Sequence, residues 1–173
     1  FNIGRNQYDL YNYKLEDFRF FSNSVPLSDV LFTPVGGQQN FVIRSDFARD
    51  FSDGTSISLN YRRIRQQGFY PNQLTKTTNF GVSVRFQSDN RRYTGFASLI
   101  SNVNEENNNF GVLDQDFVRD RQLNNRENVP VFVTDASTRH QQKQYSLINY
   151  YQLNAKESKT KILLRYDLKV DRR

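Results

Sequence analysis

The sequence predicts an all-β protein, an antiparallel up-and-down transmembrane β-barrel of which this chain supplies about six to eight strands. Two observations carry this prediction. Apolar and polar residues alternate over runs of about ten residues, the length a tilted strand needs to cross a membrane. Short turns between these runs alternate with longer links. The composition agrees with such strands: only 36% of the 173 residues are hydrophobic, and aromatic residues are common among them, with 15 Phe and 10 Tyr. Such a chain suits sheets with one apolar and one polar face.

The clearest strand is expected from Gln39 to Phe51. Phe41 and Ile43 share one parity there, while Arg44 and Asp46 share the other, so the two sets face opposite sides of a pleated strand. Further strands are expected from Ser56 to Arg65, Thr78 to Gln87, Arg92 to Val103, His140 to Gln152 and Thr160 to Val170. One or two more are expected between Leu15 and Pro34.

The polar parity of these strands is predicted to line the barrel interior. The candidate pore-lining residues are Arg44, Asp46, Asn60, Arg62, Asn79, Ser83, Arg85, Arg165, Asp167 and Lys169. The strand from Arg92 to Val103 is less regular, because it leaves Phe96 and Ile100 on the polar parity. Mixed charges on one face favour small polar solutes, or they form ion pairs that seal the lumen.

The connections divide into two kinds. Short turns are expected at Asp53-Gly54, Asp89-Asn90 and Ala155–Ser158, whereas Gln66–Gln73 and Asn104–Thr138 are longer. Outer-membrane barrels have tight turns at one rim and long external loops at the other, so residues 104–138 are predicted to form a long external loop. Its two apolar clusters, residues 110–113 and 129–133, are expected to pack on each other or on a partner. Aromatic residues are expected near both rims: Tyr61, Phe69, Tyr70 and Phe80 at one, and Phe51, Phe86, Tyr93, Tyr150 and Tyr151 at the other.

Catalytic chemistry finds little support, and we expect no enzyme and no cofactor. The chain has no Cys and one His, His140, which excludes thiolate metal sites and the common nucleophile–base pairs within this chain. We expect His140 at the surface or the rim. Glu105-Glu106, and Asp114 with Asp116, have oxygen ligands that suit Ca²⁺, but solvated loop charges explain them better.

The net charge of +6 is interpreted as basic residues that lie at the membrane surface. Arg63 and Arg65 lie where a strand leaves the bilayer toward the long-link rim, and Arg63 shares the apolar parity. A guanidinium group in that position can pair with lipopolysaccharide phosphates, or extend to the interface without a specific partner. Nucleic acid is not an expected partner, because charges alternate in sign along each strand and form no continuous basic stripe.

Four stretches of the sequence have a recognisable pattern: residues 8–11 (YDLY), 20–30 (FFSNSVPLSDV), 67–73 (QGFYPNQ) and 104–107 (NEEN). In these stretches the chain resembles a known family, the putative porins of Bacteroidetes outer membranes. One departure is the sequence Asn108-Asn109-Phe110-Gly111, where a glycine pair is expected. Family members are longer, so the resemblance implies that residues 1–173 are a single N-terminal segment of a larger barrel in the cell outer membrane.

The leading functional hypothesis is passage of small hydrophilic solutes through a completed barrel. A second is a non-conducting barrel that serves as a subunit or scaffold of an outer-membrane uptake or secretion assembly. A third, of another class, is a secreted β-sandwich that binds glycans. The expected partners are outer-membrane lipid and lipopolysaccharide, with other outer-membrane proteins for the second hypothesis.

Overall fold

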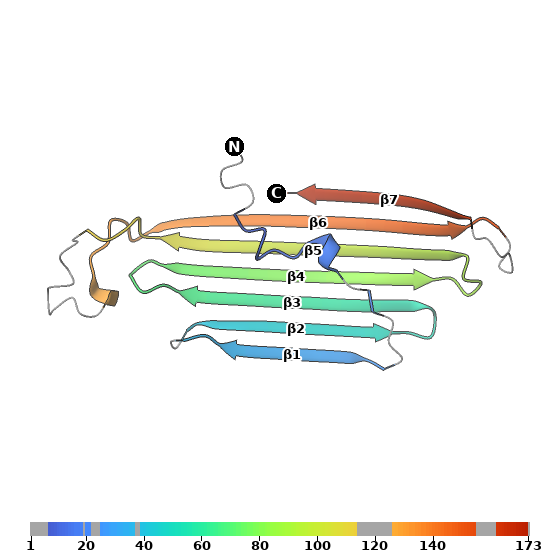
Figure 1. Ribbon diagram of the computed structural model, residues 1–173, viewed down its shortest axis with the longest axis horizontal. Helices are drawn as coiled ribbons and strands as arrows, with labels where there is room; N and C mark the ends of the chain where they lie inside the picture. Colours follow the sequence, from blue (N-terminus) through green and yellow to red (C-terminus); the bar gives the residue numbers. More distant parts are fainter. Residues whose placement is uncertain are drawn as a thin grey trace.

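Seven strands form one sheet in the computed structural model of the chain, which describes residues 7–18, 20–21, 25–36, 39–113, 126–154 and 162–172. The strands follow one another across the sheet in chain order (Figure 1). They are β1 (Leu27–Pro34), β2 (Phe41–Asp50), β3 (Thr55–Gln67), β4 (Leu74–Gln87), β5 (Tyr93–Asn108), β6 (Ala136–Gln152) and β7 (Leu163–Arg172).

Each strand pairs antiparallel with the next one in sequence, which is the up-and-down arrangement predicted. β1 is the additional strand expected before Pro34. β1 and β7 form the two edges of the sheet and do not pair with each other. The described part of the chain is therefore consistent with one portion of a barrel wall, and the prediction of an all-β, partial barrel is confirmed.

β3, β4, β5 and β6 are longer than the sequence suggested, whereas β2 and β7 are slightly shorter. β4 begins at Leu74 instead of Thr78, and β5 pairs with β6 as far as Asn108 and Ala136. The predicted loop over residues 104–138 is therefore too long at both ends, because residues 104–108 and 136–138 belong to the sheet. Alternation of apolar and polar residues fades there, while backbone pairing continues; a strand needs apolar residues only where one face meets an apolar environment.

Successive connections alternate between the two ends of the strands, and the long one between β5 and β6 lies at the end opposite the turns after β2 and β4 (Figure 1). The longer link predicted at Gln66–Gln73 is shorter than expected, residues 68–73, because Gln66 and Gln67 belong to β3 and pair with β4. The turn after β2 is tight, as Asp53-Gly54 predicted: Gly54 has φ +78°, and the side chain of Asp53 accepts a hydrogen bond from the backbone of Thr55. The turn between β4 and β5, residues 88–92, is also short. The predicted turn at Ala155–Ser158 lies outside the described residues.

At the other end, the two apolar clusters of the long connection pair with each other, as predicted. Val112 and Val131 form an isolated antiparallel bridge. The backbone of Leu113 donates to the carbonyl of Pro130, and that of Phe132 donates to Gly111. Val131 is buried. Phe110 stands at φ +55° where the family resemblance led us to expect a glycine pair.

The burial of the sheet is inverted relative to a soluble protein. Among the described residues, the buried side chains are mostly Asn, Gln, Ser and Thr, while large apolar residues such as Phe80, Leu147 and Leu168 are exposed. No second sheet covers the apolar face in the part of the chain that the structure describes. This arrangement disfavours the β-sandwich alternative, in which two inner faces pack together.

The described helical turns, η1 (Leu15–Asp17) and η4 (Arg126–Asn128), have three residues each. Neither is long or apolar enough to cross a membrane.

Candidate functional site between the N-terminal segment and the polar face

The ten predicted pore-lining residues lie on one face of the sheet, which we call the polar face. Cross-strand pairs place Arg62 opposite both Arg44 and Asn79. The same parity holds the other seven, which are Asp46, Asn60, Ser83, Arg85, Arg165, Asp167 and Lys169. That these residues line a lumen stays a prediction.

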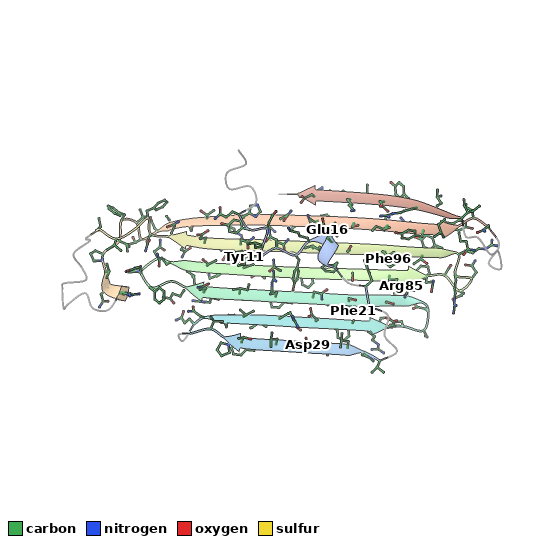
Figure 2. All side chains as sticks on the ribbon, in the orientation of Figure 1. Tyr11, Glu16, Phe21, Asp29, Arg85 and Phe96 are labelled. Atoms are coloured by element: carbon green, nitrogen blue, oxygen red, sulfur yellow. The ribbon has the colours of Figure 1, made fainter. Side chains whose placement is uncertain are left out.

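A segment near the N-terminus lies across the polar face. It comprises residues 7–18 and 20–21, is irregular apart from η1, and crosses β6 and β5 toward β4 (Figures 1 and 2). We call it the N-terminal segment. Its attachment is specific: the backbone N–H of Tyr13 donates to Oδ1 of Asn102, and Nδ2 of Asn102 donates to the carbonyl of Tyr13, both at 3.0 Å. The amide of Asn102 thus hydrogen-bonds both the N–H and the C=O of one residue of the segment, as the backbone of a neighbouring strand would.

Asparagines form the centre of this attachment. Asn79 on β4 and Asn102 on β5 are register partners, and Nδ2 of Asn79 donates to Oδ1 of Asn102 at 2.7 Å. Asn104 donates to Oδ1 of Asn12, whose own Nδ2 donates to Gln142 on β6. Asn79, Asn102 and Asn104 are fully buried. Because each buried amide has partners, this network fixes the segment at little desolvation cost.

Aromatic residues fix the segment further along. The ring of Phe18 lies over Gly81 so closely that a methyl group on Gly81 would overlap it. Phe20 packs edge-on against Phe96, with ring centroids 4.8 Å apart. Ile100, the register partner of Gly81, is fully buried. The segment therefore explains why two apolar side chains, Phe96 and Ile100, belong to the polar face.

A row of small residues provides room beneath the segment. Serines occupy one register row across four strands, namely Ser58, Ser83, Ser98 and Ser146. Three of them, Ser58, Ser83 and Ser146, are buried. Ser83, predicted as a pore-lining residue, is only 1% exposed and so does not border open space.

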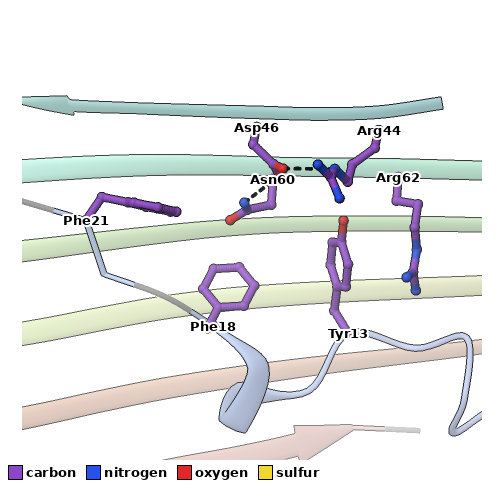
Figure 3. Close-up of a pocket in the computed structure, with 7 residues that line it drawn as sticks. All are labelled: Tyr13, Phe18, Phe21, Arg44, Asp46, Asn60 and Arg62. Atoms are coloured by element: carbon purple, nitrogen blue, oxygen red, sulfur yellow. Dashed lines mark hydrogen bonds and ion pairs between the residues drawn. The ribbon is translucent and has the colours of Figure 1, made fainter. Parts of the chain in front are cut away.

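A pocket of about 370 Å³ opens beside the segment (Figure 3). Three aromatic rings from the N-terminal side form one wall: Tyr13, Phe18 and Phe21. Four of the predicted residues form the other: Arg44, Asp46, Asn60 and Arg62. Sequence parity thus found the sheet wall of the pocket, and the aromatic wall was missed.

Arg44 and Asp46 of the pocket are paired with each other and with groups on the neighbouring strands. Arg44 bonds Asp29 on β1 at 3.0 Å and Asp46 on its own strand at 3.2 Å. Asp46 also accepts a hydrogen bond of 2.7 Å from Asn60 on β3. The two carboxylates hold Arg44 charged and fixed, so the sheet wall presents a rigid row of donors and acceptors.

Arg62 joins the sheet wall to the segment. Its Nε donates to Asn79 at 3.2 Å, its terminal nitrogen donates to the carbonyl of Tyr11, and its guanidinium group lies 4.7 Å from the centre of the Tyr13 ring. A cation over an aromatic face is attracted to it. Arg62 is therefore both a wall of the pocket and an anchor of the segment.

The other predicted residues lie apart from this pocket. Arg165 and Asp167 form an exposed ion pair of 2.6 Å on β7, where Arg165 also lies over the ring of Tyr150. Tyr150, expected near the short-turn rim, therefore lies on the polar face and not on the outward face with Tyr151. Arg85 bonds Gln87.

At the long-connection end, Tyr8 lies on β5 and β6. Its hydroxyl donates to Glu106 at 3.1 Å, and its ring stacks on His140 with centroids 5.5 Å apart. Burial raises the pKa of Tyr8 above its ordinary value, and the hydrogen bond to Glu106 raises it further. The phenol therefore stays protonated at neutral pH and remains a donor. His140 lies near this rim, as predicted.

Arg63 and Arg65 lie on the opposite, outward face, which carries the apolar residues. Glu105 faces outward too, toward Lys76 and Arg139, whereas Glu106 faces the polar side. Because Glu105 and Glu106 point to opposite faces, they do not form the paired Ca²⁺ ligands considered above. Asp114 and Asp116 lie outside the described residues, and the described residues contain no group of three potential metal ligands.

The missed half of the site had a weak sequence signal. Tyr13, Phe18 and Phe21 precede the first strand and show no alternation, so no face could be assigned to them. Phe96 and Ile100 did indicate the missing half, since apolar side chains on a polar face are stable there only if another part of the protein packs over them.

Comparison with known proteins identifies a family for this chain. A family model described as "Putative porin" matches residues 1–173, the whole chain. Neither a curated protein nor a solved structure gives a significant match.

Proposed function

This chain belongs to the putative porin family, and from that premise we propose that it forms part of an outer-membrane barrel that passes small hydrophilic solutes. The polar face lines the lumen and the apolar face contacts lipid. This is a role in passage and needs no catalytic group.

The observation that carries the proposal is the inverted burial of the sheet. Outward residues of neighbouring strands form continuous apolar rows whose members are exposed or half-buried, of which one is Phe47, Leu59, Val82, Leu99, Tyr145 and Val170. An exposed apolar area that crosses so many strands is far larger than a soluble monomer tolerates. Lipid is the surrounding that such a face suits.

The rows on this face change in the order that a bilayer requires. Near the short turns the outward residues are mainly aromatic: Phe51, Phe86, Tyr93, Tyr151 and Tyr166. Aliphatic rows follow, then Tyr61 with Phe80, and then Arg63 and Arg65. Ten residues separate Thr55 from Arg65 on β3. At about 3.3 Å each and a tilt of about 40°, they rise roughly 25 Å, the height of the apolar band in outer-membrane barrels.

The N-terminal segment narrows the lumen in this proposal. It covers part of the polar face, and beside it lies the pocket with three rings on one wall and paired donors and acceptors on the other. Arg44 and Asp46 are already paired with each other, and Arg62 is bound to the segment, so the pocket suits uncharged or zwitterionic polar solutes over ions. Solutes therefore pass beside Tyr13, Arg44 and Asp46.

The same segment favours the second candidate, a non-conducting subunit or scaffold of an assembly. Its contacts to Asn79, Asn102 and Asn104 are buried and mutually satisfied, as in a permanent plug. A plug attached in this way has no need to move.

Solute flux decides between the two. The complete protein that contains this chain would be placed in liposomes, and swelling measured with sugars of increasing size. Passage of monosaccharides with exclusion of longer oligosaccharides supports the porin. Liposomes that exclude every sugar, but contain heat-modifiable folded protein, support the scaffold and contradict the porin.

A further inference from the structure

The two faces of the sheet differ in the sign of their charges. On the outward positions of β2–β7, the charged residues are Arg49, Arg63, Arg65, Lys76, Glu105, Arg139, Lys143 and Arg172. Only Glu105 is acidic among these described positions. On the polar face both signs are common, as at Arg44 with Asp46 and Arg165 with Asp167. The outward face is therefore selectively basic.

Most of these basic residues lie at one end of the strands, on the side of the long connection. Register pairs align Arg65, Lys76, Glu105 and Arg139 in a single row across β3–β6, and Arg63 lies one row further in. We call the four basic residues of these rows, Arg63, Arg65, Lys76 and Arg139, the basic band. It begins where the aliphatic rows end.

The band lacks counter-charges on its β3 side. Arg65 lies opposite Phe41 on β2 and Lys76 on β4. Like charges directly opposite each other destabilise a sheet. Arg63 lies between Ile43 and Thr78, so neither outward neighbour is acidic. An anion from outside the sheet that comes between these cations would stabilise the arrangement.

Both arginines also have donors that no described residue of the chain satisfies. The Nε atoms of Arg63 and Arg65 are buried and have no hydrogen-bond partner among the described residues. Arg65 has one partner at its terminal nitrogen, the side chain of Gln39 at 2.6 Å. An unpaired buried donor is costly, and each side chain as a whole is only half-buried, so an outside acceptor can reach it after a rotamer change.

On the β5 side, Glu105 holds the remaining cations in place. It lies 3.8 Å from Lys76 and 3.7 Å from Arg139. One carboxylate between two cations leaves a net positive charge while fixing their spacing. The side chain of Arg139 is 65% exposed, so its guanidinium group is open to the lipid side.

We propose that the basic band binds the phosphate groups of lipopolysaccharide in the outer leaflet. The inference rests on the proposed function, because it requires the apolar face to lie in lipid. A phosphate of this glycolipid sits at the boundary between acyl chains and water, which is the height of the band on the external side. Arginine donors in a fork suit phosphate oxygens, and the aliphatic rows below suit the acyl chains.

The test uses the complete folded protein in detergent. Its unfolding midpoint would be measured from heat-modifiable gel mobility while bis-phosphorylated lipid A is titrated into the micelles. We expect saturable stabilisation, weakened at least tenfold in apparent affinity by Arg63→Gln with Arg65→Gln. Lipid A without phosphates, phosphatidylglycerol and inorganic phosphate should give little or none.

Arg49→Gln is the matched control, since Arg49 is also basic and outward but lies toward the short turns. It should leave the lipid A response unchanged. An equal response in the Arg63/Arg65 variant, or from dephosphorylated lipid A, overturns the site. A similar response to phosphatidylglycerol overturns the choice of lipopolysaccharide. Sugar flux separates the two proposals. If the Arg63/Arg65 variant loses lipid A binding but passes sugars as the wild type does, both proposals stand. If the wild type binds lipid A but passes no sugar, the porin role alone is contradicted.

Discussion

The ring of Phe18 lies directly over Gly81, and no side chain could replace the glycine hydrogen without moving the ring. Gly81 pairs with Asn60 on β3 and Ile100 on β5. Phe18 therefore contacts the middle of the polar face, and a segment with almost no regular secondary structure obtains a fixed position there. The geometry of the pocket depends on this contact.

Gly81→Ala should move Phe18 and loosen the N-terminal segment. The strand tolerates alanine, so the barrel should still fold while single-channel conductance in a planar bilayer rises, because the covered part of the lumen opens. Gly95→Ala is the control, since its nearest neighbour is the Tyr93 side chain on the outward face, with the hydroxyl oxygen 2.9 Å from the added carbon, and Phe18 is not among its nearest contacts. Equal conductance in wild type and both variants would show that Phe18 does not restrict passage.

Asn102→Ala should detach the segment by another route. It removes both hydrogen bonds to the Tyr13 backbone and leaves Asn79 with one fewer acceptor, a loss of about 2–4 kcal/mol for several buried bonds. We expect limited proteolysis to cleave the segment in the variant while the barrel remains heat-modifiable. Ser101→Ala, on the outward face of the same strand, should leave the segment protected. A segment that stays equally protected in Asn102→Ala contradicts the role assigned to this side chain.

The sheet could be predicted from the sequence because its information is local. Parity along β2, β3 and β4 follows from residues two apart, such as Phe41 and Ile43, and the turn at Asp53-Gly54 is a short-range signal. The sheet wall of the pocket, including Arg44 and Arg62, followed from the same parity. The ends of β5 and β6 could not be read in this way, because backbone pairing there no longer requires apolar side chains.

The cover of the polar face could not be predicted, since its contacts are non-local. Tyr13 and Asn102 are 89 residues apart, and Asn12 and Gln142 are 130 apart. Nothing in the sequence near Tyr13 encodes these pairs. The isolated apolar residues Phe96 and Ile100 indicated that something lies on the polar face, without indicating what.

Arginine substitutions at neighbouring positions of β6 should distinguish the lipid-facing side of the strand from the lumen-facing side by their cost in stability. Tyr145 faces outward in a mid-height row, and Gln144 faces the polar side opposite Asp171. Tyr145→Arg should lower the free energy of unfolding by about 2–4 kcal/mol, the cost of arginine near mid-bilayer. Gln144→Arg gains an acidic neighbour and should cost less than about 1 kcal/mol. Urea unfolding in lipid vesicles measures both, and equal costs would contradict the assignment of faces.

Gly54→Ala should destabilise the hairpin of β2 and β3. Gly54 stands at φ +78°, and a methyl group there would overlap the backbone carbonyl of Gln87, which is a rigid neighbour. We expect a loss of about 1–3 kcal/mol from strain and displacement together. Gly36→Ala is the control, because φ is +37° there but, apart from its chain neighbours, no atom of the described residues lies within 4 Å of the added carbon. Thermal unfolding in detergent should give Gly54→Ala a clearly lower unfolding temperature than Gly36→Ala. Equal unfolding temperatures would show that the Gln87 contact is unimportant.

The central claim is that the apolar face of the sheet contacts lipid and the polar face does not. β7 tests it best, because its residues are exposed on both faces and the chain has no cysteine of its own. Single cysteines would be placed at each position from Leu164 to Val170 of the complete protein, spin-labelled in membranes, and tested for collision with oxygen, which concentrates in lipid, and with a water-soluble nickel chelate. Collision of the spin labels should alternate along the strand with a period of two. Labels that collide mainly with oxygen are expected at Leu164, Tyr166, Leu168 and Val170, and labels that collide mainly with the nickel chelate at Arg165, Asp167 and Lys169. Equal access of the nickel chelate to every position would contradict it.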